Sequence, residues 1–198
     1  MEQIFDQLIN SYMDDNVGVK KHFLSADLVH SLKLNLASLF SQNTFKDAGT
    51  SNDNIVINKL VRSDKIYWLD RAHNNSVEND FFDLMDAFVM HLNRSCYTGI
   101  TSYEFHYALY EEGSFYSRHL DQFRSNESRK YSMIMYLNEE WKAGDGGELR
   151  VHHDDNSIQD IAPESGTGVF FKSNELSHEV LVTNKPRMSV TGWLKVDV

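Results

Sequence analysis

The segment Ser102-Tyr-Glu-Phe-His-Tyr-Ala-Leu-Tyr-Glu-Glu-Gly-Ser-Phe-Tyr-Ser-Arg-His-Leu-Asp121 marks the point at which the sequence changes from helical to strand-like spacing. Residues 102–110 alternate as in a β-strand, and the run that follows leads to the tripeptide His119-Leu-Asp121. Residues two positions apart point to the same side of a strand. The segment therefore predicts a sheet protein together with a candidate site, a His-x-Asp pair delivered by a strand.

Before this segment, apolar residues recur at helical spacing. The periodicity predicts helices over residues 2–13, 25–40 and 76–96, and Ser25 and Asp27 suit the start of the second helix. The polar run 46–54 predicts a loop, and residues 65–69 predict a strand. Short strands are also predicted at 102–110, 131–137, 148–152, 168–171, 178–182 and 187–196.

Helices followed by strands favour an antiparallel β core over alternating parallel β/α units. We expect the α+β class, with a double-stranded β-helix of the jelly-roll or cupin-like kind and the N-terminal helices packed on one face. With 198 residues, 41% of them hydrophobic, the chain can bury one sizeable core. We expect one domain over residues 1–198, with helical support over about 1–98 and the jelly roll over about 99–198.

The charge balance limits the classes of partner. The formal net charge is −10, whereas nucleic-acid binding depends on clustered Lys and Arg, so we expect no nucleic-acid partner. Neither a long apolar run nor a signal segment is visible, so we expect no membrane association. The single Cys96 excludes an internal disulfide and fits a reducing compartment, and the cytoplasm is the expected location.

A His-x-Asp tripeptide alone is weak evidence for a metal site, because this sequence contains three. Two of them overlap in the polar run His152-His-Asp-Asp155 after a Gly-Gly turn, which predicts a solvated hairpin end. His119 and Asp121 lie between apolar strand candidates, and His178 begins another such strand. Two imidazoles and one carboxylate are the ligand set of non-haem Fe(II) oxygenases, although a buried core histidine is the alternative for His178.

The last predicted strand presents an arginine on its inward face. The residues that share this face are Arg187, Ser189, Thr191 and Trp193. A buried guanidinium needs an anionic partner, and its fork of N–H groups matches a carboxylate. In an iron oxygenase the expected acid is the distal carboxylate of 2-oxoglutarate, with Tyr136 or Ser189 supplying a hydroxyl. The alternative is an exposed Arg187 paired with a surface acid.

Taken in order, these residues resemble the 2-oxoglutarate- and Fe(II)-dependent prolyl 4-hydroxylase-like oxygenases, the group that contains the animal oxygen-sensing prolyl hydroxylases and their bacterial relatives. The resemblance covers about residues 60–195. It is carried by Tyr110, Tyr116, Arg118-His-Leu-Asp121, Tyr136-Leu-Asn138, Trp141, Gly146-Gly-Glu-Leu149, Ile161-Ala-Pro163, Val169-Phe-Phe171, His178-Glu-Val180 and Arg187-Met-Ser-Val-Thr-Gly-Trp193.

The resemblance assigns roles to the site residues. It implies that His119, Asp121 and His178 bind iron and that Arg187 and Tyr136 hold the far carboxylate of 2-oxoglutarate. By the same likeness, Tyr110 lines the co-substrate pocket, Tyr116 and Trp193 form pocket walls near a substrate proline, and Arg129 contacts the target peptide.

The segment Arg62-Ser-Asp-Lys65 resembles the start of a loop that covers the substrate, and we expect an ion pair between Asp64 and Arg129 to close it. Ser63 replaces the usual Gly of this segment, and Glu111, Glu112 and Gln122-Phe123 also depart from the animal enzymes. The departures flank the substrate entrance. They leave the iron site intact and put the identity of the substrate in question.

The implied activity is that of a 2-oxoglutarate-dependent Fe(II) dioxygenase. Such an enzyme uses dioxygen, with ascorbate as a reductant, to hydroxylate a protein or peptide, here at C4 of a prolyl residue. The bacterial relatives suggest a translation protein as the substrate. The alternatives are an oxygenase of the same fold that acts on a non-prolyl residue or a small molecule, and a non-catalytic jelly-roll binding module.

Overall fold

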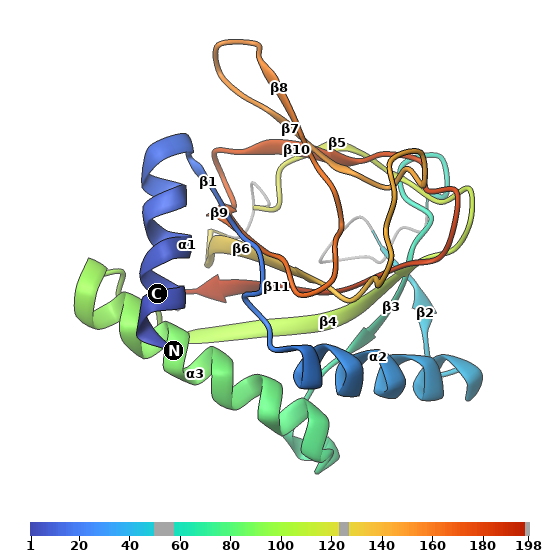
Figure 1. Cartoon of the computed structure of the whole chain (residues 1–198), viewed down its shortest axis with the longest axis horizontal. Helices are drawn as coiled ribbons and strands as arrows, with labels where there is room; N and C mark the ends of the chain where they lie inside the picture. The colour runs from blue at the N-terminus through green and yellow to red at the C-terminus, as the bar shows by residue number, and fades with distance from the viewer. Residues whose placement is uncertain (50–57, 123–126, 197–198) are drawn as a thin grey trace.

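The strand predicted at residues 102–110 is β4 (Ser102–Tyr110), a long strand of the larger of two antiparallel sheets (Figure 1). The computed structural model describes residues 1–49, 58–122 and 127–196. Within these ranges the larger sheet has the order β1-β9-β6-β11-β4-β3-β2, and the smaller sheet has the order β5-β10-β7-β8. The two sheets face each other as in a double-stranded β-helix, so the predicted α+β jelly roll is confirmed.

The helices are α1 (Glu2–Asp15), α2 (Ala26–Ser41) and α3 (Ser76–Cys96), with the short 3₁₀ helix η1 (Arg71–His73). The other strands of the larger sheet are β1 (Val17–Lys20), β2 (Lys46–Asp47), β3 (Lys65–Trp68), β6 (Arg129–Tyr136), β9 (Gly168–Lys172) and β11 (Arg187–Lys195). The smaller sheet is formed by β5 (Tyr116–His119), β7 (Leu149–His152), β8 (Ile158–Ile161) and β10 (Ser177–Val180).

The N-terminal helices start at polar caps, as the sequence predicts for α2. The Oγ atom of Ser25 accepts a hydrogen bond from the backbone N–H of Leu28 at 3.3 Å. At the start of α3, Oδ1 of Asn75 accepts from the N–H groups of Val77 and Glu78 at 2.9 and 3.2 Å. These bonds satisfy N–H groups that lack a partner within the helix, which fixes where each helix begins.

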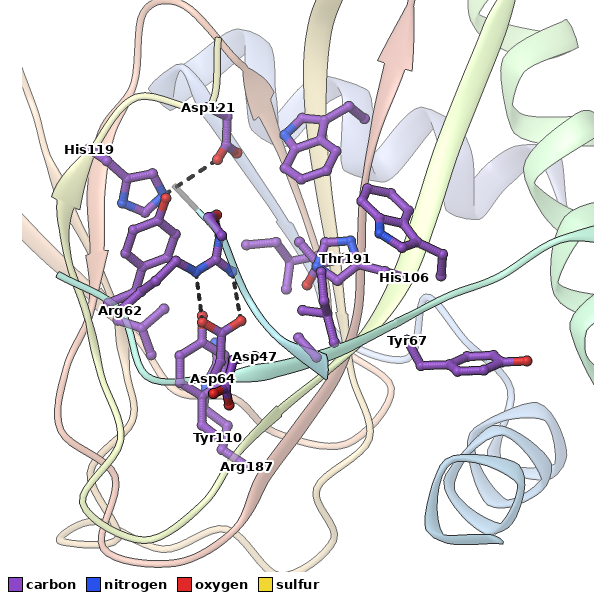
Figure 2. Close-up of a pocket in the computed structure, with 18 of the residues that line it drawn as sticks. Asp47, Arg62, Asp64, Tyr67, His106, Tyr110, His119, Asp121, Arg187 and Thr191 are labelled. Atoms are coloured by element: carbon purple, nitrogen blue, oxygen red, sulfur yellow. Dashed lines mark hydrogen bonds and ion pairs between the residues drawn. The ribbon is translucent and has the colours of Figure 1, made fainter. Parts of the chain in front are cut away.

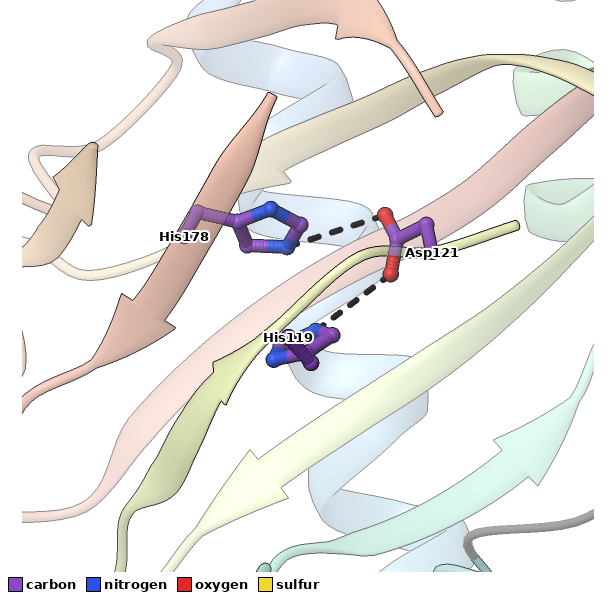
Figure 3. A group of neighbouring side chains, drawn as sticks. All are labelled: His119, Asp121 and His178. Carbon is purple, nitrogen blue, oxygen red and sulfur yellow. Dashed lines mark ion pairs between the residues drawn. The ribbon is translucent and has the colours of Figure 1, made fainter. Parts of the chain in front are cut away.

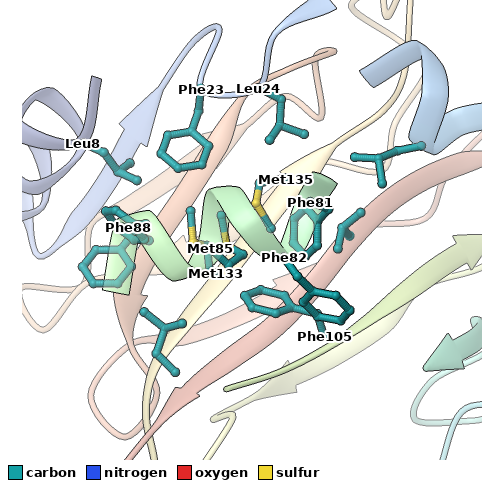
Figure 4. Close-up of a cluster of buried hydrophobic side chains, with 14 of the residues drawn as sticks. Leu8, Phe23, Leu24, Phe81, Phe82, Met85, Phe88, Phe105, Met133 and Met135 are labelled. Atoms are coloured by element: carbon teal, nitrogen blue, oxygen red, sulfur yellow. The ribbon is translucent and has the colours of Figure 1, made fainter. Parts of the chain in front are cut away.

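The helices cover the outer face of the larger sheet and bury the main apolar core against it (Figures 1 and 4). Side chains from α3 meet side chains from β4 and β6 in this layer: Phe81, Met85, Phe88, Phe105, Met133 and Met135. Burying one such side chain contributes about 1.5–3 kcal/mol. This layer holds the larger sheet in place from outside and leaves its other face for the site.

The inner face of the larger sheet points toward the smaller sheet. Because side chains alternate along β4, Phe105 and Tyr107 contact the helices, whereas Ala108 and Tyr110 belong to a second apolar cluster between the sheets. Leu149 of β7 is buried in the same cluster. The site lies on this inner face.

The three helices and the strands that were predicted are present, but the N-terminal half also supplies parts of the sheet. Strands β1, β2 and β3 all precede residue 99, so the larger sheet is not confined to the C-terminal half. The loop predicted at 46–54 is wrong at Lys46–Asp47, which pairs with β3, and residues 50–54 lie outside the described residues.

Strands β1 and β8 were not predicted either. In β1, an added Cβ on Gly18 would lie 2.6 Å from the carbonyl oxygen of Leu8, so the strand runs too close to α1 for a side chain there. Such short segments owe their strand conformation to their neighbours rather than to a local pattern. Among the described helices, none combines the length and the apolar content needed to cross a membrane.

Candidate metal and co-substrate site

Three side chains converge at the edge of the smaller sheet: His119, Asp121 and His178 (Figure 3). His119 ends β5, and His178 is its register partner in β10. Asp121 lies beyond the end of β5 rather than inside the strand as expected, and its backbone N–H donates to Ser173 O at 3.1 Å. One ligand atom from each residue lies within 4.8 Å of the other two, so the structure brings the predicted triad together.

Hydrogen bonds to the backbone fix which nitrogen of each imidazole faces the centre. Nδ1 of His119 lies 2.8 Å from Ser117 O, and Nδ1 of His178 lies 3.0 Å from Leu176 O. Since a carbonyl oxygen only accepts, Nδ1 carries a proton in both rings, which leaves Nε2 as the atom that can offer a lone pair to a metal. The Nε2 atoms lie 3.4 and 3.7 Å from the carboxylate oxygens of Asp121. Two lone pairs and a carboxylate directed at one point suit a divalent iron ion.

The protonation states of the triad also favour a metal. Burial lowers the pKa of His178 to about 4, against the attraction of Asp121. Burial alone would raise the pKa of Asp121, but the two imidazoles and the Ser132 hydroxyl hold that pKa far below its usual range. At neutral pH the site therefore presents an ionised carboxylate and a neutral His178 imidazole, the forms that bind metal ions.

Neighbouring side chains orient the triad. Ser132 Oγ donates to Asp121 Oδ2 at 2.6 Å. The ring of Tyr116 stacks on His119 with centroids 3.6 Å apart, and Phe171 meets the other imidazole edge-on at 4.8 Å. The contribution of Ser132 was not predicted, although a polar residue in the apolar run 131–137 was the available signal. Partners of this kind fix ligand orientation and raise metal affinity.

The triad opens into a cavity of about 580 Å³ between the sheets (Figure 2). Besides the triad, seven residues that the sequence nominated line it: Arg62, Asp64, Tyr110, Tyr116, Arg129, Arg187 and Trp193. Two nominated hydroxyl residues, Tyr136 and Ser189, are not among its lining residues within the described chain. Ser189 Oγ lies 3.1 Å from Oγ1 of Thr191, which does line the cavity.

Arg187 lines the cavity and is only 2% exposed, so the alternative of a surface ion pair is wrong. Its Nε donates to Gly147 O at 2.8 Å, whereas Nη2 has no hydrogen-bond partner among the described residues. The same is true of the buried hydroxyl of Tyr136. The guanidinium carbon lies 5.0 Å from the ring centre of Tyr136 and 4.9 Å from that of Tyr110. Buried donors without acceptors are costly, so this pair fits an anion such as a carboxylate.

The remaining His-x-Asp pairs lie at the β7–β8 hairpin, which projects from the sheets (Figure 1). His152 Nε2 lies 2.9 Å from a carboxylate oxygen of Glu179, and His153 Nε2 lies 3.2 Å from Oε1 of Gln159. The two aspartates of the run are exposed. The predicted solvated hairpin end is confirmed.

The predicted ion pair between Asp64 and Arg129 is wrong in this structure. Asp64 is held by Arg62, whose Nε and Nη2 donate to its two carboxylate oxygens at 2.8 and 2.6 Å (Figure 2). Arg129 pairs with Glu104 at 2.7 Å. The guanidinium of Arg62 also lies 4.2 Å from the ring centre of Tyr116, so this pair forms part of the wall beside the triad. The sequence alone does not show which of the two arginines contacts Asp64 in the folded chain.

Removing the carboxylate of Asp64 is expected to destabilise the protein. The Asp64 side chain is 0% exposed, so Asp64→Asn leaves the Arg62 charge buried without its anion and is expected to cost about 3–5 kcal/mol of unfolding free energy. Asp160→Asn is a matched control, because Arg150 holds Asp160 through the same bidentate contact at a half-exposed site. Urea unfolding should show a loss of less than about 1 kcal/mol for the control. Equal losses would contradict the role of burial.

Sequence reasoning also missed His106, a buried polar residue of the cavity wall. It lies on the inward face of β4, four positions before Tyr110, in contact with the rings of Trp68 and Trp193, whose centroids are 4.9 and 5.5 Å from that of the imidazole. Its place in the alternation of β4 was the available signal. Burial, together with the charges of Arg62 and Arg129, lowers the pKa of His106 to about 3. The ring is therefore neutral at physiological pH.

This buried histidine predicts a pH dependence of stability. The pKa of His106 is 6.5 in the unfolded chain and about 3 in the folded protein, so between these two pH values only the unfolded chain binds the proton. The contribution of the neutral ring to the free energy of unfolding is therefore fully present above pH 6.5 and is lost as the pH falls toward 3. The His106 contribution to this loss is about 2 kcal/mol at about pH 5. Urea unfolding of His106→Phe should show a shallower acid decline than wild type. The exposed His30→Phe variant should decline as wild type does, and a wild-type decline in His106→Phe would contradict the prediction.

Comparison with known proteins identifies the family to which this site belongs. The model of the 2OG-Fe(II) oxygenase superfamily matches residues 105–195. The crystal structure of a prolyl-4-hydroxylase from Pseudomonas putida is 31% identical in sequence, with a TM-score of 0.88 over 98% of this chain and 100% of that chain. The chain belongs to the 2OG-Fe(II) oxygenase superfamily. The predicted family and fold of this oxygenase are thereby confirmed.

Two further relatives of the oxygenase are informative. A prolyl hydroxylase from Trichoplax adhaerens, solved with a peptide fragment of the hypoxia inducible factor oxygen degradation domain, is 22% identical and has a TM-score of 0.87, covering 98% of this chain and 90% of that chain. At that identity it shows the fold alone. The prolyl 3-hydroxylase OGFOD1 of Xenopus laevis is 36% identical over an alignment of 77 residues, and the match covers 34% of this chain and 15% of that protein. The match therefore spans a small part of that curated relative.

Membership of the superfamily implies Fe(II), 2-oxoglutarate and dioxygen. The residues of this oxygenase fit those groups. The triad supplies two neutral nitrogens and one carboxylate, and the unpartnered Nη2 of Arg187 and hydroxyl of Tyr136 supply donors for a dicarboxylate.

Proposed function

We propose that this oxygenase binds Fe(II) through His119, Asp121 and His178, binds 2-oxoglutarate through Arg187 and Tyr136, and hydroxylates a prolyl residue of a protein or peptide. The observation that carries the proposal is the presence of two complementary features at one cavity. A metal-binding triad lines one side, and a buried arginine without an acceptor for Nη2 lines another.

The protein contributes orientation and exclusion of water, whereas bound iron supplies the redox chemistry by which dioxygen and 2-oxoglutarate are consumed and a C–H bond is hydroxylated. When 2-oxoglutarate is bound, Arg187 Nη2 and the Tyr136 hydroxyl would each donate a hydrogen bond to its far carboxylate. Ser189, the register partner of Tyr136, is proposed as a further hydroxyl near that carboxylate. Tyr110 packs beside the guanidinium of Arg187 and also lines the cavity.

The relatives support a prolyl substrate. The Pseudomonas putida protein is described as a prolyl-4-hydroxylase, and the Trichoplax adhaerens structure holds a peptide. Tyr116 and Trp193 line this cavity with aromatic rings beside which a pyrrolidine ring can pack. Arg129 is proposed to contact the peptide, and the Arg62–Asp64 pair is proposed to shape the entrance.

The substrate, the reductant and the location of the protein are proposed from the sequence resemblance. We propose a translation protein with an exposed proline as the substrate, ascorbate as the reductant and the cytoplasm as the location. Hydroxylation of a non-prolyl residue or of a small molecule is the alternative activity.

The test begins without oxygen. Fe(II) and 2-oxoglutarate added to the protein under anaerobic conditions should produce the weak visible charge-transfer band of the chelate. Absence of the band would refute co-substrate binding at the metal. With oxygen and proline-containing peptides, we expect succinate together with a peptide heavier by one oxygen atom, detected by mass spectrometry. Succinate without a modified peptide, or with modification at another residue, would favour the alternative activity.

A further inference from the structure

A second set of unpartnered polar atoms lies in the cavity wall, away from Arg187. Nδ1 of His106 and Nε1 of Trp193 are buried and have no hydrogen-bond partner among the described residues. Both residues line the cavity and are 3% and 8% exposed. A buried polar group without a partner is costly, because it has lost its hydrogen bonds to water and gained none in the protein. Two such groups on adjacent rings in one wall point to a ligand that supplies the missing partners.

The geometry of the sheet separates this pair from the co-substrate. Arg187 is the register partner of Tyr110, and His106 lies four positions from Tyr110 along β4, which is about 13 Å of extended strand. The five-carbon chain of 2-oxoglutarate is about half that long, given C–C bonds of about 1.5 Å. The backbone positions of Tyr110 and His106 are therefore about twice as far apart as the two ends of the co-substrate, which places His106 at a different part of the cavity wall from Arg187.

The same pair lies near the triad. Trp193 is the register partner of Ser132, and Ser132 donates to the carboxylate of Asp121. His106 is in ring contact with Trp193, with centroids 5.5 Å apart and planes inclined by 31°. The two unpartnered nitrogens are thus carried by the part of the larger sheet that faces the metal site, where the substrate has to lie.

The chemistry of the two nitrogens narrows the class of ligand. The indole Nε1 only donates, so it requires an acceptor. The imidazole of His106 is neutral at physiological pH and offers one donor and one acceptor. The flanking rings of Trp68 and Trp193 favour a flat group, and the guanidinium of Arg129, 3.4 Å from the Trp193 ring centre, disfavours a cation. A peptide group is planar and presents a carbonyl oxygen with two lone pairs.

We propose that His106 is a specificity-determining residue which, together with Nε1 of Trp193, hydrogen-bonds a main-chain amide of the polypeptide substrate beside the residue that is hydroxylated. The proposal rests on the proposed function and adds a mode of recognition to it. Recognition through the main chain selects polypeptides over small acids while leaving the flanking side chains of the substrate free to vary.

The test uses two variants and one probe. His106→Phe keeps a flat ring in contact with the two indoles and removes both nitrogens, whereas His106→Asn places an amide near the position of Nδ1. The probe is a mixture of short N-acetylated, C-amidated peptides with a central proline and random flanks. The KM for the probe should rise about ten- to a hundred-fold in His106→Phe and recover most of the way in His106→Asn, with the KM for 2-oxoglutarate unchanged in both. An unchanged KM for the probe in His106→Phe would overturn the proposal.

A binding measurement separates this inference from the catalytic proposal. The wild-type protein, labelled with nitrogen-15 histidine and loaded with Zn(II) and 2-oxoglutarate, is titrated with the probe. The Nδ1 resonance of His106, identified by its absence in His106→Asn, should shift. No shift overturns the His106 proposal whether or not the peptide is hydroxylated. Failure of the proposed function would instead appear as absence of the anaerobic chelate band, which does not depend on His106.

Discussion

The His178→Ala variant is expected to lose iron-dependent turnover of 2-oxoglutarate by more than about a hundred-fold, because loss of a mere orienting partner of a ligand already costs about 10–100-fold in metal affinity or activity. His178 Nε2 faces the Asp121 carboxylate with its lone pair exposed to the centre of the triad, and alanine has no replacement for it. Iron retention after dialysis, the anaerobic chelate band and succinate formation measure the loss.

The sequence contains its own control for this prediction. His153 and Asp155 form the same tripeptide pattern as His119 and Asp121, but they lie at the end of the β7–β8 hairpin. His153→Ala and Asp155→Ala should leave iron retention and turnover at wild-type values. A thermal scan adds a second readout, since Zn(II) should raise the Tm of these controls and should fail to do so for His178→Ala. Loss of turnover in these controls would contradict the assignment of the metal site to His119, Asp121 and His178.

The fold was predictable where pattern and burial agree. Strand β4 has the predicted bounds, because its two faces contact different layers and its side chains alternate accordingly. The triad was predictable because His119 lies between apolar strand candidates and His178 begins another; the strands that carry the two histidines, β5 and β10, pair in one sheet. Asp121 was placed correctly in the cluster for a partly wrong reason. It reaches the imidazoles from the turn after β5, held by Ser173, and not from the strand.

The partner of Asp64 and the surroundings of His106 were not predictable, because they depend on which residues the folded chain brings into contact. Asp64 pairs with Arg62, two positions away in the chain, whereas Arg129 pairs with Glu104. His106 carries no motif, and its environment arises from β3 and β11 lying on either side of β4. Register across a sheet decides such contacts, and a single sequence does not specify register between segments far apart in the chain.

The Arg187→Met variant is expected to raise the KM for 2-oxoglutarate by about 30- to 4000-fold, which corresponds to the 2–5 kcal/mol lost when one partner of a buried charge pair is removed. Methionine fills a similar length without charge, so iron binding through the triad should stay at the wild-type value. Titration of succinate formation against 2-oxoglutarate measures the effect, and the chelate band at saturating 2-oxoglutarate checks that the metal site remains.

Substitutions at Arg187 and Tyr136 should not lower the free energy of unfolding of the unliganded protein, although they weaken its affinity for 2-oxoglutarate. In the protein without 2-oxoglutarate, Nη2 of Arg187 and the hydroxyl of Tyr136 are buried without partners, so both are maintained at a cost in unfolding free energy. Arg187→Met and Tyr136→Phe are therefore expected to be as stable as wild type or more stable when unliganded, while both bind 2-oxoglutarate more weakly. If Arg187 served only to stabilise the fold, Arg187→Met would instead lower the free energy of unfolding and leave the KM for 2-oxoglutarate unchanged. Since Nε of Arg187 also holds Gly147, the Tyr136→Phe variant is the cleaner comparison: it removes one hydroxyl and leaves that backbone contact in place.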